Sequence, residues 1–249
     1  MKLKLILTTA VALAYAFPAT ASKYKILTSE QPPYVEKQGN DAVGIAVDIT
    51  KELFKRSNIQ YEIVFLPLVS AIRDAKSNEG SCAMPIKRSQ DREYHYRWVA
   101  PLLVTQSGLF VKQGQPIQLS VLKDVLKYKI GAVRGSDEED YLKGLGAQVK
   151  GVNNDLENAV KLDSGGVNVW STDTISGQYY ADKAGIKVEN KISFRTAMRT
   201  LACNLKMPDA DFEKLDSNLD AMYKDGTIKK IFDKYTANMK IDESVQFLN

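Results

Sequence analysis

The feature that most constrains the fold is an alternation of short apolar segments with amphipathic helical segments, which starts again near the middle of the chain. In the first half, segments 24–28, 61–66 and 82–86 are predicted strands, and helices are predicted to start at Asp48 and at Leu68. Strands that alternate with helices form a mostly parallel sheet covered by helices. The first half therefore predicts one α/β lobe.

The same pattern begins again around the turn-rich segment 112–116. Strands are predicted at 108–111, 129–133, 149–152, 167–170 and 201–205, and helices at 121–126, 138–145, 155–162, 175–184, 212–223 and 228–235. The repetition predicts an α/β protein of two lobes. Ligands of open α/β sheets bind at the carboxyl ends of strands, and three turns lie at such ends, after Thr28, Ile86 and Trp170.

The first 21 residues have the pattern of a cleavable secretory signal peptide. A basic start is followed by the apolar run 5–17 and by a small-x-small site that ends at Ala21. The alternative, a membrane anchor, would need ~17 to 25 apolar residues to span a bilayer, and this run is shorter. We therefore expect residues 1–21 to be removed and the remaining chain to be exported to the periplasm without membrane insertion.

The charge balance argues against nucleic acid or a membrane surface as partner. The chain has 34 lysine and arginine residues against 30 aspartate and glutamate residues, a formal charge of +4. Removal of the signal peptide takes away Lys2 and Lys4 and leaves +2, which is too balanced to attract polyanions.

Two cysteines, Cys82 and Cys203, and a single histidine are the only residues of these types. Export permits a disulfide, and two buried free thiols are the alternative. These residues lack the spacing of metal ligands, so we expect no metal site and no cofactor.

A cluster of charged residues follows the predicted strand 82–86. Five of them fall within seven positions: Lys87, Arg88, Asp91, Arg92 and Glu93. Guanidinium groups at the end of a buried strand can bind a carboxylate with two parallel hydrogen bonds. A solvated surface loop is the alternative interpretation of such a charge run.

Three groups of motifs resemble those of the family 3 extracellular solute-binding proteins, the two-lobed polar amino acid receptors of ABC importers. The first is Pro32-Pro33-Tyr34 with the segment 44–49, the second is 88–93 with 98–101, and the third is 225–235. The resemblance covers essentially the whole exported chain. It implies the type II periplasmic binding protein fold, in which a small-molecule ligand is trapped between lobes joined by two crossings.

The resemblance also implies the limits of the lobes and the partners. Lobe 1 would comprise residues 22–110 and 201–249, and lobe 2 would comprise residues 111–200, with crossings near Val111 and Thr200. We expect a monomer that delivers its ligand to an ABC transporter permease. Both cysteines would lie in lobe 1 on strands that the family pairs side by side, so a disulfide and two free thiols remain the alternatives.

The resemblance assigns site residues by position. Arg92 matches the arginine that clamps an α-carboxylate, and Asp173 matches the acid that receives the ligand's ammonium group. Further expected ligand-binding residues are Arg134, Ser136 and Asp137 in a turn of lobe 2, and Gln31, Tyr34, Leu68, Lys87, Arg88 and Ser89 in lobe 1. Lys87 and Arg88 add positive charge beside the clamp, which favours an anionic solute such as a dicarboxylate or an acidic amino acid.

Two other functions are alternatives for a chain with this resemblance. One is a periplasmic enzyme resembling cyclohexadienyl dehydratase, in which Glu30 or Asp173 would act as the general acid. The other is a ligand-sensing module for a membrane partner. We expect a binding protein and not an enzyme, because the sequence shows no paired carboxylates, no Ser/His/Asp group and no phosphate loop.

Overall fold

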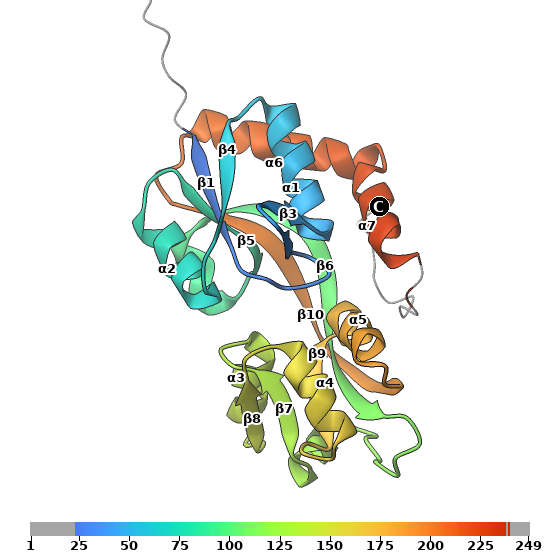
Figure 1. Cartoon of the computed structure of the whole chain (residues 1–249). Helices are drawn as coiled ribbons and strands as arrows, with labels where there is room; N and C mark the ends of the chain where they lie inside the picture. The colour runs from blue at the N-terminus through green and yellow to red at the C-terminus, as the bar shows by residue number, and fades with distance from the viewer. Residues whose placement is uncertain (1–22, 238, 240–249) are drawn as a thin grey trace, which may run out of the picture.

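The computed structural model describes residues 23–237 and residue 239, and the expected signal peptide lies outside the described residues. Figure 1 shows two α/β lobes joined by two long strands. Eight strands form one continuous sheet in the order β4-β1-β5-β10-β6-β9-β7-β8. The prediction of a two-lobed α/β protein is confirmed. In the described part of the chain, no helix has the length and apolar character needed to cross a membrane.

The first lobe is built on three parallel strands, with β1 between the other two. Its strands are β1 (Tyr24–Thr28), β4 (Tyr61–Phe65) and β5 (Ser81–Lys87), and its helices are α1 (Ile45–Ser57), α2 (Leu68–Ser77), α6 (Asp209–Lys224) and α7 (Thr227–Thr236). A hairpin of β2 (Glu36–Gln38) and β3 (Asp41–Val43) and the short 3-10 helix η1 (Gln90–His95) complete it. The strand–helix alternation of the sequence is present as expected.

The second lobe repeats the design, with β7 between its two parallel neighbours. Its strands are β7 (Ile130–Val133), β8 (Val149–Val152) and β9 (Val169–Asp173), and its helices are α3 (Asp137–Gly144), α4 (Asp155–Asp163) and α5 (Thr174–Ala184). The helix predicted at 121–126 is the 3-10 helix η2 (Leu122–Lys127).

Strands β6 (Arg97–Lys112) and β10 (Val188–Cys203) pass through both lobes and pair antiparallel along their lengths. The sequence predicted only one end of each strand. On β6, Leu103 packs in the core of the first lobe, whereas Leu109 packs in the core of the second.

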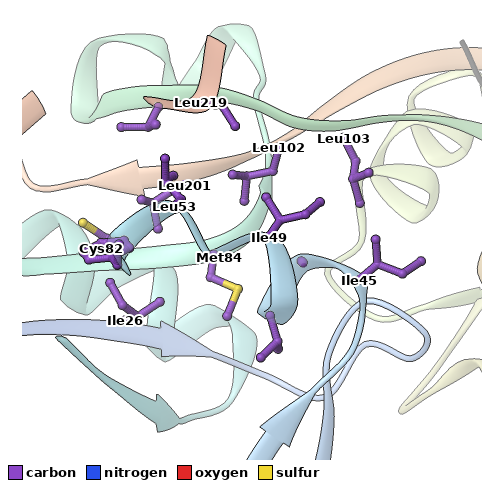
Figure 2. Close-up of a cluster of buried hydrophobic side chains, with 14 of the residues drawn as sticks. Ile26, Ile45, Ile49, Leu53, Cys82, Met84, Leu102, Leu103, Leu201 and Leu219 are labelled. Atoms are coloured by element: carbon purple, nitrogen blue, oxygen red, sulfur yellow. The ribbon is translucent and has the colours of Figure 1, made fainter. Parts of the chain in front are cut away.

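The main core of the first lobe lies between its sheet and helix α1. Figure 2 shows Ile49 and Leu53 of α1 meeting Met84 of β5 and Leu102 of β6, and all four are fully buried. Each such side chain stabilises the fold by about 1.5–3 kcal/mol through removal of apolar surface from water. The apolar stripe seen in the sequence therefore holds α1 against the sheet.

Helix α1 starts at Ile45, which is earlier than predicted. Gly44 is its N-cap residue, and Asp48 lies inside the first turn. Gly44 has a φ of 127°, and a Cβ atom there would lie 2.4 Å from the carbonyl oxygen of Tyr34. Only glycine fits this close approach. The carboxylate of Asp48 does not cap the helix, and it instead accepts a hydrogen bond from the Tyr235 hydroxyl and pairs with Lys234.

Cys82 and Cys203 face each other on the neighbouring strands β5 and β10, and the structure joins them by a disulfide. Both residues are fully buried in the core of the first lobe. The bond ties the C-terminal end of β10 to β5, the neighbouring strand of the first lobe.

Replacing both Cys82 and Cys203 by serine is expected to lower the free energy of unfolding by about 2–5 kcal/mol, because the cross-link constrains the unfolded chain. Urea denaturation of the purified protein measures this loss. In intact-mass analysis, reduction should add the mass of two hydrogen atoms. Thiols that can be alkylated in the denatured, unreduced protein would contradict the disulfide.

Candidate functional site

A cavity lies between the lobes, at the carboxyl ends of strands from both lobes. The first lobe contributes the loop after β1, the start of α2, the end of β5, and η1. The second lobe contributes the turns that lead into α3 and α4, the end of β9, and one face of α5. Strand β10 adds Arg199. This is the position at which open α/β sheets bind ligands.

The turn between β7 and α3 brings three polar residues to the second-lobe wall. The hydroxyl oxygen of Ser136 accepts a hydrogen bond from the Glu139 backbone N–H at 3.2 Å and so caps the helix. Asp137 and Glu138 follow at the helix start and line the cavity. Arg134 lies outside the cavity, where its guanidinium donates a hydrogen bond to the Gly151 carbonyl oxygen.

Lys87 and Glu138 form an ion pair across the cavity, from the end of β5 to the start of α3. The Ser107 hydroxyl also donates to the Glu138 carboxylate, at 2.6 Å. Burial by itself would raise the pKa of Glu138, but the charge and hydrogen bond of Lys87, together with Ser107, outweigh it and lower the pKa from 4.5 to about 2. This pair therefore holds the two lobes together.

A second buried pair joins Arg199 of β10 to Asp173 at the end of β9, with a distance of 2.8 Å between Nη2 and Oδ2. The other Asp173 oxygen accepts from the Tyr34 hydroxyl at 2.6 Å and from the backbone N–H groups of Ile175 and Ser176. The Arg199 guanidinium lies 3.9 Å from the centre of the Tyr34 ring. Both oxygens of Asp173 are thus occupied by groups of the protein itself.

Arg92 on η1 is the least engaged cation of the cavity. Its Nη1 atom donates to the Lys87 carbonyl oxygen at 3.3 Å and to the Asp137 carboxylate at 3.4 Å, and both contacts are long. Among the described residues, its Nε and Nη2 atoms have no hydrogen-bond partner, and a quarter of the side chain is exposed. Oδ2 of Asp137 is buried and has no partner in the described part of the chain.

Asp155, the first residue of α4, contributes a further carboxyl group to the cavity. Its oxygens accept hydrogen bonds from the Trp170 indole N–H at 2.9 Å and the Thr172 hydroxyl at 3.0 Å. Burial, together with the negative charge of Asp173, raises the pKa of Asp155 from 3.8 to about 7 and outweighs the hydrogen bonds from Trp170 and Thr172, which lower it.

The structure brings together seven of the residues expected from the sequence: Gln31, Leu68, Lys87, Arg92, Ser136, Asp137 and Asp173 line the cavity. Four others lie elsewhere. Arg88 pairs with Glu93 beside Trp98, Ser89 flanks the start of η1, Tyr34 is buried behind Asp173, and Arg134 faces β8.

Sequence reasoning missed Glu138, Asp155 and Arg199 as cavity residues. Arg199 lies in the part of β10 that the pattern did not mark as a strand, and Asp155 was considered only as a helix start. The order of turns at strand ends was a usable signal for Asp155, because it follows β8 just as Asp137 follows β7. Among the described residues, no group of His, Cys, Asp and Glu has a metal-binding arrangement.

Replacing Glu138 by glutamine tests the ion pair across the cavity. Since the folded-state pKa of Glu138 is lowered, the stability it contributes is present above pH 4.5 and is lost as the pH falls towards 2. Between pH 4.5 and pH 2, we expect the free energy of unfolding of Glu138→Gln to fall by less than that of the unchanged protein. The difference between the two decreases should be on the order of 2 kcal/mol.

Urea denaturation at a series of pH values measures the effect. Glu213→Gln is the matched control, because Glu213 is exposed on α6 and should leave the pH dependence unchanged. Equal pH dependence in Glu138→Gln and in the unchanged protein would contradict the assigned pair.

Comparison with known proteins gives one family over nearly the whole described chain. Residues 24–238 match the model of the bacterial extracellular solute-binding proteins, family 3. A search of the curated proteins found no match.

Solved structures share the fold over most of the chain. An ancestral arginine-binding protein bound to arginine is 24% identical with a TM-score of 0.73, over 86% of this chain and 99% of that one. The arginine-, lysine-, histidine-binding protein ArtJ from Geobacillus stearothermophilus is 19% identical with a TM-score of 0.75, over 89% and 97%. A histidine kinase sensor domain with similarity to periplasmic binding proteins is 16% identical with a TM-score of 0.77, over 89% and 99%.

Proposed function

The chain belongs to the bacterial extracellular solute-binding proteins of family 3, and on this premise we propose that it captures a small polar solute between its lobes for an ABC importer. The observation that carries the proposal is the cavity itself, which is lined by both lobes at the carboxyl ends of their strands. A solute that contacts both lobes favours the closed state, because those contacts exist only there. The periplasm and a transporter permease are the corresponding location and partner.

Arg92 is the proposed clamp for a carboxylate of the solute. Its guanidinium is planar and permanently charged, and two of its three nitrogen atoms have no partner among the described residues. A carboxylate can therefore form two parallel hydrogen bonds with it without breaking a strong internal contact. Arg88 is less suited, because Glu93 already occupies its guanidinium.

The similar solved structures support an amino acid or a related carboxylate as the solute. One of them has arginine bound, and another binds arginine, lysine and histidine. A solute of this class offers the carboxylate that Arg92 would receive. The first experiment is a thermal-shift screen of the purified protein with amino acids, dicarboxylates and prephenate, since binding to the folded state raises the melting temperature.

Arg92→Ala is expected to weaken binding of the best solute from this screen by at least ~2 kcal/mol, or about 30-fold in Kd, because a desolvated carboxylate loses its partner. Arg88→Ala is the matched control and should bind normally. Isothermal titration calorimetry measures both. Normal binding by Arg92→Ala would remove Arg92 from the site.

The alternative function, a lyase that acts on prephenate, can be tested with the same purified protein. Incubation with prephenate is expected to give no product, because neither candidate general acid, Asp173 or Glu30, is well placed for proton transfer. Asp173 already accepts from four donors, and Glu30 is exposed at the cavity edge. Turnover of prephenate would support the enzyme instead.

A further inference from the structure

The charges that line the cavity do not balance. Three cationic side chains and five carboxylates line it. Each cation is paired with a carboxylate, since Lys87 pairs with Glu138, Arg92 with Asp137, and Arg199 with Asp173. The two remaining carboxylates are Asp155 and Glu30, and neither has a cationic partner in the described part of the chain. With all five carboxyl groups ionised, the cavity would carry two more negative charges than positive charges.

Asp155 is the more enclosed of these two carboxyl groups. Its hydrogen-bond donors, Trp170 and Thr172 of β9, are both neutral. Two charged groups raise the pKa of Asp155: Asp173 at the end of β9 and Glu138 on α3, and both are negative. On α5, the negative charge of Asp155 raises the pKa of the Tyr180 hydroxyl. Asp155 does not cap its own helix either, because Asn154 accepts the hydrogen bond from the Glu157 backbone N–H.

We propose that the solute carries a cationic side chain, an ammonium or guanidinium group, and that Asp155, not Asp173, receives this side-chain cation. This inference rests on the proposed solute-binding function and specifies the solute. A carboxylate in a partly desolvated cavity without a counter-ion is unfavourable, and a cationic group of the solute relieves that cost through a charge-assisted hydrogen bond. Asp173 is less suited to this role, because its charge is already paired with Arg199 and its Oδ1 atom already accepts three hydrogen bonds.

The same geometry weakens the argument for an anionic solute that Lys87 and Arg88 suggested. Lys87 is held by Glu138, and Arg88 lies outside the cavity on Glu93. A second anionic group on the solute would meet Asp155, and the described residues place no unpaired cation beside it. An amino acid with its carboxylate on Arg92 and a cationic side chain on Asp155 matches both ends of the cavity.

Solute binding should depend on pH in a defined direction. Asp155 has a pKa of about 7 in the ligand-free protein, and only its carboxylate form attracts a cation. Below that pH most molecules carry the neutral form, so the apparent affinity falls in proportion to the carboxylate fraction. Between pH 8 and pH 6 we expect affinity for a cationic solute to drop about tenfold.

The test compares L-arginine with L-citrulline, which replaces the guanidinium by a neutral ureido group, and with L-lysine and L-glutamate. Calorimetric titrations at pH 8 and pH 6 use the unchanged protein, Asp155→Asn, and the control Asp140→Asn, whose side chain is exposed on α3. We expect arginine or lysine to bind, and the corresponding neutral and acidic solutes to bind at least about tenfold more weakly. Asp155→Asn should lose this preference and the pH dependence, and Asp140→Asn should keep both.

A stability measurement shows that any loss in Asp155→Asn does not come from misfolding. Because the folded state raises the pKa of Asp155 above 3.8, this residue destabilises the ligand-free protein progressively as the pH rises from 3.8 to about 7. Asp155→Asn should therefore have a higher melting temperature than the unchanged protein at pH 8, in the absence of solute.

The outcomes separate this inference from the function on which it rests. If citrulline or glutamate binds as tightly as arginine and lysine, or if Asp155→Asn keeps the preference for a cation, the inference is overturned and the solute-binding function stands. If none of the four solutes binds but a neutral or anionic solute of the thermal-shift screen does, the inference about a cationic solute is also overturned, and the solute-binding function stands. If no solute binds at all, both are overturned.

Discussion

The buried ion pair between Arg199 and Asp173 is the interaction on which the rest of the site depends. Arg199 lies on β10 where this strand pairs with Lys87 of β5 and Leu103 of β6. Asp173 ends β9 and caps α5, so the pair fixes the second lobe against the crossing strands. Removal of either partner would leave an uncompensated buried charge, at a cost of about 3–5 kcal/mol.

Solute capture in this protein is an exchange of interactions, because the cavity is already partly paired with itself. The contact between Arg92 and Asp137 is long and is the easiest to replace, whereas the contacts of Glu138 with Lys87 and Ser107 are close and buried. Affinity is the difference between solute contacts and the internal contacts they displace. We therefore propose that a solute gains most at two positions: at the loosely held Arg92, and at Asp155, which has no cationic partner among the described residues.

The sequence predicted the architecture well because strand–helix alternation and apolar periodicity follow from local rules. It predicted the ends of β6 and β10 poorly, since polar residues of β10 such as Arg195 and Arg199 interrupt the apolar pattern while long-range pairing with β6 still makes the strand. Charge alone also misplaced Arg88, because nothing local shows that Glu93 turns it away from the cavity. The proposed role of Asp155 could be found only from the structure, because it depends on which of the described residues lie around its carboxyl group.

The central claim is that a small solute lies between the lobes with its carboxylate on Arg92. A crystal structure of the protein grown with its best solute from the thermal-shift screen tests this most directly. The account predicts density for that solute in the cavity, with a carboxylate within hydrogen-bonding distance of the Arg92 guanidinium and contacts from both lobes. Density for the solute elsewhere on the protein, with the pair between Arg92 and Asp137 intact, would contradict it.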